Sequence, residues 1–272
     1  MKLSNLAVRL LTAAVFVPLL VLLLYRGPAW GLYLLILPAS LIGTYELVTM
    51  THRGDRVSQI IALVLAGGAS AALYFGDDLR WAVTVLAIAP VAGPVLTLIR
   101  LGDVKTAALR ALAMSVAPLF VSVPLAWLAL MRRDVPHGAS YVVMTLMFAW
   151  FGDTGGYFAG RFLGKHKLYE AVSPKKTVEG AFGSLVGSVC GGLLAHFWFL
   201  PSIPLLHVVP LALVAGALGQ AGDLGESLLK RSTGVKDSGA IVPGHGGILD
   251  RIDALVLTST VVYLYTLWIK PK

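Results

Sequence analysis

Charged residues are nearly absent from long stretches of this chain, and such stretches recur from one end to the other. Of its 272 residues, 57% are hydrophobic and 13% are charged, and the mean hydropathy is +0.80. A soluble domain carries roughly a quarter charged residues, whereas about 20 consecutive apolar residues can cross a bilayer as a helix. The pattern predicts an all-α polytopic membrane protein.

Windows of the required length occur repeatedly, so we expect about nine transmembrane helices. They are predicted near residues 6–25, 29–50, 57–76, 80–99, 108–131, 138–160, 178–200, 203–222 and 252–269. The first window could also be a secretory signal peptide, but its apolar run is longer than usual and lacks a clear small-residue cleavage site. The region 57–101 fits least well, because glycine and proline interrupt it.

The positions of Lys and Arg predict the orientation. Most of the 22 Lys and Arg residues fall in segments that face the cytoplasm if the N-terminus is inside, as the positive-inside rule requires. This orientation places the polar segments 161–177 and 223–251 on the cytoplasmic side. The net charge of +8 is then explained by loops facing anionic lipid, and no nucleic-acid partner is expected. With Cys190 as the one cysteine, no internal disulfide can form.

Residues 1–272 are predicted to form a single integral membrane domain, because no internal repeat or long polar linker stands out. Residues 1–137 are apolar with short loops and read as a scaffold half. Residues 138–272 carry nearly all the clusters of glycine and charge, and read as a catalytic half.

The first cluster, residues 151–167, places Asp153 within an apolar window. Ionisable groups inside a membrane are costly and usually mark function. The alternative is an aspartate that hydrogen-bonds neighbouring helices or lies at the interface. The spacing of the glycines in this cluster suits close helix packing as well as it suits a ligand.

The second cluster, residues 173–180, combines a predicted helix start with basic residues. Ser173 followed by Pro174 is typical of an N-cap and a first helical turn. The free N–H groups of that turn, beside Lys175, Lys176 and Thr177, would favour a phosphate. The alternative is a helix cap next to a positively charged cytoplasmic loop, which would explain both lysines.

The third cluster contains two pairs of carboxylates. Asp223 and Glu226 are three residues apart and share one face of a helix, and Asp250 and Asp253 repeat this spacing where the last window begins. Two such pairs on neighbouring helices predict a Mg²⁺ site, although the acids could merely balance nearby cations. His245 has no second His or Cys beside it, which argues against zinc and favours a hydrogen bond to phosphate or to a carboxylate.

A longer pattern joins these pieces. It runs Ser-x-apolar-Lys-Arg, Lys-Asp and Pro-x-His-Gly-Gly-x-x-Asp-Arg-x-Asp, and here it comprises Ser227, Leu229, Lys230, Arg231, Lys236, Asp237, Pro243, His245, Gly246, Gly247, Asp250, Arg251 and Asp253. With this pattern and the segments 153–161 and 173–180, the chain resembles the phosphatidate cytidylyltransferase family, also called CDP-diacylglycerol synthases.

The resemblance implies a reaction of CTP with phosphatidic acid that gives CDP-diacylglycerol and pyrophosphate and requires Mg²⁺. It also implies a bacterial inner membrane or an equivalent one, a site facing the cytoplasm, a homodimer, and compatibility with a second, monovalent cation such as K⁺. The attacking lipid phosphate is already ionised, so no protein nucleophile or strong base is needed. Positioning and charge neutralisation would then do most of the work.

These considerations assign roles to individual residues. The expected catalytic residues are Asp223, Asp250, Lys230, Arg231 and Lys236. The expected metal ligands are Asp223 and Asp250, supported by Asp253 and Glu226. The expected substrate-binding residues are Ser173, Lys175, Lys176, Thr177, Glu179, His245, Gly246, Gly247 and Arg251.

Two other functions remain open at this point. A CTP-dependent lipid kinase acting on a polyprenol or similar alcohol would share the membrane and the nucleotide, but would need a base to deprotonate a hydroxyl. An ion-coupled secondary transporter would place its polar groups near the bilayer midplane between paired repeats, whereas the polar clusters of this chain fall toward one face.

Overall fold

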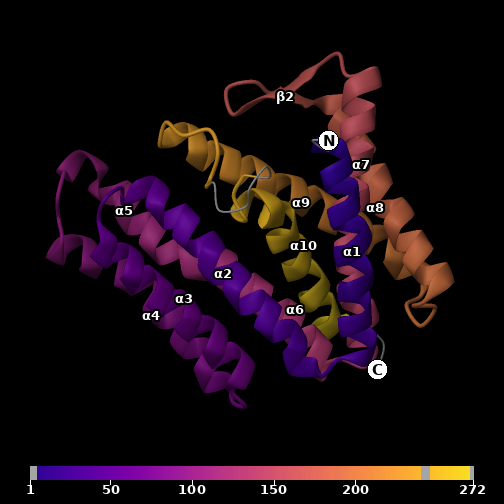
Figure 1. Cartoon of the computed structure of the whole chain (residues 1–272), viewed down its shortest axis with the longest axis horizontal. Helices are drawn as coiled ribbons and strands as arrows, with labels where there is room; N and C mark the ends of the chain where they lie inside the picture. The colour runs from indigo at the N-terminus through magenta and orange to yellow at the C-terminus, as the bar shows by residue number, and fades with distance from the viewer. Residues whose placement is uncertain (1–4, 240–245, 270–272) are drawn as a thin grey trace.

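The computed structural model describes residues 5–239 and 246–269, which are almost wholly helical (Figure 1). The helices are α1 (Asn5–Arg26), α2 (Ala29–Thr51), α3 (Arg56–Phe75), α4 (Leu79–Ile99), α5 (Val104–Ala117), the π-helical turn η1 (Pro118–Ser122), α6 (Val123–Asp134), α7 (Gly138–Leu163), α8 (Val178–Trp198), α9 (Leu205–Ser232) and α10 (Leu249–Trp268). Two short strands, β1 (Lys167–Tyr169) and β2 (Ser173–Thr177), form a hairpin between α7 and α8. The predicted all-α class is therefore confirmed, with a small hairpin added.

Six helical segments within the described residues are long and apolar enough to cross a membrane. They are Ala29–Thr51, Arg56–Phe75, Arg80–Ile99, Val104–Asp134, Val178–Trp198 and Leu205–Ser232. A polytopic membrane protein is thus supported. The other three predicted spans coincide with α1, α7 and α10, which are helical but outside this set, so the count of nine stays a prediction.

The helix starts of the N-terminal half are capped by aspartates. The side chains of Asp55, Asp78 and Asp103 accept hydrogen bonds from backbone N–H groups in the first turns of α3, α4 and α5. Such caps satisfy donors that have no partner inside the helix. These three acids therefore have a structural role, since they stabilise the starts of α3, α4 and α5.

The predicted span 108–131 is a continuous rod made of α5, η1 and α6. Within it, the N–H of Val123 donates to the carbonyl of Pro118, a π-type bond that inserts one extra residue in the turn. Pro124 follows directly; proline has no N–H and its ring clashes with the carbonyl four residues earlier in a regular helix. The wider turn removes that conflict without breaking the helix.

The helices of the C-terminal half pack in chain order, α7 against α8, α8 against α9 and α9 against α10. In Figure 1, α3, α4 and α5 lie on the left and α7 and α8 on the right. Helices α2, α6 and α10 contact one another between them. Val48, Leu125 and Phe148 are among the fully buried residues of this common core.

Glycines bring α7 and α8 into backbone contact, as their spacing predicts. A Cβ at Gly155 would overlap the carbonyl oxygen of Gly183, and one at Gly187 would overlap the carbonyl oxygen of Phe151. In a membrane, where apolar side chains gain nothing by leaving lipid, such close approach is a main source of helix–helix affinity. Helices α7 and α8 are accordingly the most closely packed pair in the described part of the chain, and they support the side chains that project from them.

We expect Gly187→Ala to destabilise the protein by about 1–3 kcal/mol, the usual cost of forcing an extra methyl group into a packed site. The measurement is the thermal unfolding midpoint in detergent. Gly68→Ala is the matched control, because a Cβ at Gly68 in α3 meets nothing within 4 Å and alanine favours a helix. Equal midpoints for the two variants would contradict the packing argument.

Candidate active site

The hairpin between α7 and α8 corrects one prediction. Ser173 does not cap a helix and Pro174 is not in a first turn, because both lie in β2, which pairs antiparallel with β1. The Nζ of Lys167 donates to the carbonyl of Pro174 at 2.5 Å, which helps to keep this segment extended. The actual N-cap of α8 is Thr177, whose Oγ1 accepts from the N–H of Gly180 at 3.1 Å.

Glu179, in the first turn of α8, holds the base of the hairpin. Its Oε2 accepts from the N–H groups of Lys165 (3.1 Å) and His166 (3.3 Å), and its Oε1 lies 2.6 Å from His166 Nδ1. These bonds tie the end of α7 to the start of α8. Its predicted contact with substrate stays a prediction, since Glu179 does not line the cavity described next.

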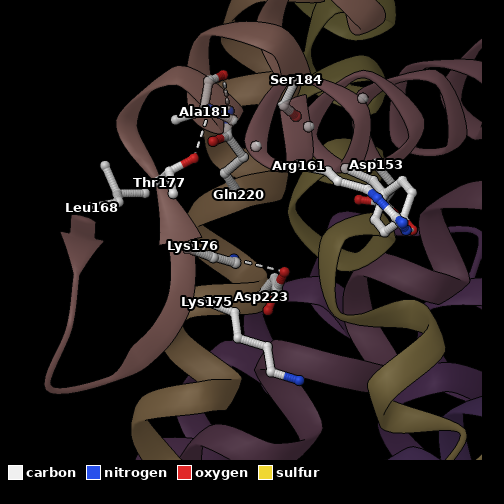
Figure 2. Close-up of a pocket in the computed structure, with 15 residues that line it drawn as sticks. Asp153, Arg161, Leu168, Lys175, Lys176, Thr177, Ala181, Ser184, Gln220 and Asp223 are labelled. Carbon is white, nitrogen blue, oxygen red and sulfur yellow. Dashed lines mark hydrogen bonds and ion pairs between the residues drawn. The ribbon is translucent and has the colours of Figure 1, made fainter. Parts of the chain in front are cut away.

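A cavity of about 540 Å³ opens between α7, the hairpin, α8 and α9 (Figure 2). Its lining residues are Gly152, Asp153, Gly156, Tyr157, Gly160, Arg161, Leu168, Lys175, Lys176, Thr177, Gly180, Ala181, Ser184, Gln220 and Asp223. Four of them are glycines of α7 and α8, which leave parts of those two walls without side chains. The remaining wall brings together cations, carboxylates, hydroxyls and an amide, which is suited to a ligand that is both charged and polar.

An ion pair crosses this cavity from the hairpin to α9. Lys176 Nζ lies 2.6 Å from Asp223 Oδ2, and both side chains are about one-quarter to one-third exposed. Figure 2 shows Lys175 beside this pair. The two polar segments that the sequence places on one side of the membrane, 161–177 and 223–251, are therefore in direct contact.

A second set of contacts joins the end of α9 to the start of α10. Lys230 Nζ lies 2.5 Å from Asp250 Oδ1 and 3.2 Å from Glu226 Oε1. The other oxygen of Asp250, Oδ2, accepts from Ser238 Oγ (2.8 Å), Ser238 N (3.2 Å) and Gly247 N (3.2 Å). Asp250 is thus held in one orientation by both flanks of the loop before α10.

The predicted carboxylates converge at this end of the helices. Asp253 lies within electrostatic range of Asp223 and of Asp153, and Glu226 lies within range of Asp250 and Asp253. Like charges held this close repel one another. Their neighbours Lys176 and Lys230 offset part of that repulsion.

The donor chemistry fits Mg²⁺. Carboxylate oxygens are the ligands that Mg²⁺ prefers, and it commonly takes only one or two of them, the remainder being waters and substrate phosphates. Within residues 5–239 and 246–269, no three His, Cys, Asp or Glu side chains form a group that could enclose a metal ion. An ion shared between a few carboxylates and a ligand suits this arrangement better than an all-protein cage.

The other predicted residues lie around this centre. Arg231 Nε donates to the carbonyl of Val172 at 3.3 Å, linking α9 to the hairpin. Lys236 is exposed in the loop after α9, and Arg251 is exposed in the first turn of α10. Gly246 has a φ of +81°, a conformation that favours glycine. His245 lies outside the described residues.

Several cavity residues escaped the sequence-based assignment. Arg161 Nη1 donates to the Tyr157 hydroxyl at 2.6 Å, and Gln220 Nε2 donates to the Ala181 carbonyl at 3.3 Å. Ser184 also lines the cavity. Helical spacing could have identified two of these, since Gln220 precedes Asp223 by three residues and Tyr157 follows Asp153 by four.

Comparison with known proteins shows the family of this chain. Residues 7–269 match the model of a family described as the cytidylyltransferase family. A phosphatidate cytidylyltransferase from Brucella suis is 45% identical over 139 residues, which cover 51% of this chain and 51% of the relative. One from Staphylococcus saprophyticus is 44% identical over 120 residues, covering 44% of this chain and 46% of the relative. The matched part therefore spans about half the length of these curated relatives. Because the family model extends over nearly the whole sequence, the chain belongs to the cytidylyltransferase family.

Proposed function

We propose that this protein transfers the cytidylyl group of CTP to phosphatidic acid, giving CDP-diacylglycerol and pyrophosphate. The observation that carries the proposal is the cavity crossed by the Lys176–Asp223 pair, beside the Lys230–Asp250 pair, in a largely apolar helical protein of the cytidylyltransferase family. The names of the Brucella and Staphylococcus relatives support the choice of phosphatidic acid as acceptor.

The chemistry requires two polyanions to approach each other. An oxygen of the lipid phosphate attacks the α-phosphorus of CTP, a new P–O bond forms, and the bond to the bridging oxygen breaks as pyrophosphate leaves. Since the attacking group is already an anion, the protein need not remove a proton. Lys175 and Lys176 at the cavity wall are well placed to offset phosphate charge, and rigid positioning supplies much of the acceleration.

The carboxylates would serve a metal ion in this reaction. Asp223 and Asp250 would hold Mg²⁺, with Glu226 and Asp253 close by. The number of carboxylates would also allow a second, monovalent cation such as K⁺ to bind. When bound, Mg²⁺ would stabilise the negative charge that develops on the phosphate oxygens. Lys176 and Lys230, which now contact Asp223 and Asp250, are the cations that substrate phosphates would engage.

We also propose that the protein lies in the inner membrane of a bacterial cell and that its site faces the cytoplasm. We further propose that it acts as a homodimer. The orientation is supported by the excess of Lys and Arg in the segments around the site and by the cytoplasmic location of nucleotides. The dimer rests on the family resemblance alone.

Purified protein with CTP, phosphatidic acid and Mg²⁺ should transfer label from the α-phosphate of CTP into lipid and release pyrophosphate. Label from the γ-phosphate should not enter lipid, because that phosphate leaves with pyrophosphate. Transfer of the γ-label to an alcohol would instead show a CTP-dependent lipid kinase. Solute flux in proteoliposomes, with no CTP turnover, would show a transporter.

Asp223→Asn and Asp250→Asn should each lower turnover by more than about 100-fold, since even residues that only support metal ligands commonly cost about 10–100-fold. The readout is pyrophosphate release by protein that elutes as the wild type does in detergent. Asp78→Asn is the matched control, because Asp78 caps α4 and pairs with the exposed Arg80 away from the site. Wild-type rates in both site variants would show that Asp223 and Asp250 are not the metal ligands.

A further inference from the structure

A buried carboxylate of the N-terminal half reaches the site without having been assigned any role. Glu46 lies in α2, inside an apolar span, and only 2% of its surface is exposed. No Lys or Arg within the described residues forms an ion pair with it. A buried carboxylate is costly unless hydrogen bonds compensate for the lost water, so its contacts should explain why it is there.

Those contacts are with the segment around Asp250. Glu46 Oε2 accepts from the N–H of Leu249 at 2.8 Å, and Ser238 Oγ lies 3.4 Å from the same oxygen. Leu249 is the first residue of α10, where N–H groups lack partners and the helix dipole favours a negative charge. Glu46 therefore caps α10 from a different helix, more than 200 residues earlier in the chain.

The same contacts lead directly to Asp250. Ser238 Oγ is 2.8 Å from Asp250 Oδ2, and the N–H groups of Ser238 and Gly247 bond that oxygen as well. Ser238, which approaches Glu46, is thus a hydrogen-bond partner of Asp250, and Leu249, which donates to Glu46, is the neighbour of Asp250 in the chain. A displacement of the Glu46 carboxylate would be transmitted to Asp250 through both.

The backbone on both sides of residues 240–245 is packed against this carboxylate. A Cβ at Gly239 would overlap Glu46 Oε1, and a Cβ at Gly247 would overlap Ser238 Oγ and come within 2.7 Å of Glu46 Oε2. Only glycine allows so close an approach at both positions. Hence Glu46 is enclosed by the two flanks of the loop that precedes α10.

We propose that Glu46 is a positioning residue for this site: from α2 it fixes residues 238–239 and 247–249, and thereby sets the orientation of Asp250 against Lys230. The inference rests on the proposed function for its effect on catalysis. Its structural part, the placement of residues 238–239 and 247–249, can be tested without substrate.

The decisive comparison is between Glu46→Gln and Glu46→Asp. Glutamine keeps the length and one oxygen acceptor but loses the charge, whereas aspartate keeps the charge and withdraws it by one methylene group. If position matters, Glu46→Gln should keep kcat within about threefold of the wild type, while Glu46→Asp should lose about 10–100-fold in kcat with little change in KM for CTP. Glu170→Asp, in the exposed hairpin turn, is the control.

Hydrogen–deuterium exchange supplies the readout that does not depend on turnover. Peptides covering residues 238–250 should exchange faster in Glu46→Asp than in the wild type, while α8 peptides and the thermal midpoint stay unchanged. Normal exchange and turnover in Glu46→Asp, or loss of turnover in Glu46→Gln but not in Glu46→Asp, would overturn the proposal. So would general unfolding of both variants, which would make Glu46 a residue of global stability.

Different results would reject the proposed function and the role of Glu46. If wild-type protein forms no CDP-diacylglycerol, the proposed function is wrong, but faster exchange confined to residues 238–250 would still support the positioning role. If the wild type is active and that exchange is unaltered by Glu46→Asp, the function stands and the role of Glu46 is rejected.

Discussion

The pairing of lysines with carboxylates at one end of a largely apolar set of helices is the interaction on which the site depends. Asp250 and Glu226 share Lys230, whose side chain is only 13% exposed, and Asp223 pairs with Lys176. Removing one partner of a buried ion pair costs about 3–5 kcal/mol, because the other charge is left without compensation. The lysines, or a cation that replaces them, therefore compensate the carboxylates at this end of the helices.

Sequence patterns predicted the parts of the molecule that depend on local chemistry. Apolar windows located the helices, since backbone groups in lipid must be satisfied within the helix itself. The three-residue spacing of Asp223 and Glu226, and of Asp250 and Asp253, correctly predicted that each pair lies within one helix. The glycine spacing in α7 likewise anticipated its close contact with α8, because small residues permit backbone approach whatever else surrounds them.

The missed features arise from contacts between residues far apart in the chain. Ser173 and Pro174 resemble a helix start locally, but pairing of β2 with β1 draws them into a strand, and Thr177 takes over as the cap. Glu46 could have been noticed from the sequence. Like Asp153, it is a carboxylate inside an apolar window, and such residues are unusual. Its partners at positions 238 and 249, however, are not deducible from spacing.

The contacts of Glu46 also change how the two halves of the chain are understood. Besides Glu46, Arg53 reaches across from the end of α2 and donates to the carbonyl of Thr233, at 2.8 Å, just after α9 ends. Apolar packing alone gives helices in lipid little preference for one partner over another, so polar contacts of this kind specify which helix ends meet. A site formed by α7 to α10 alone would lack both contacts, and residues 238–239 and 247–249 would lose the support that Glu46 gives them. The N-terminal half thus helps to build the site, even though all the groups proposed to meet substrate lie in the other half.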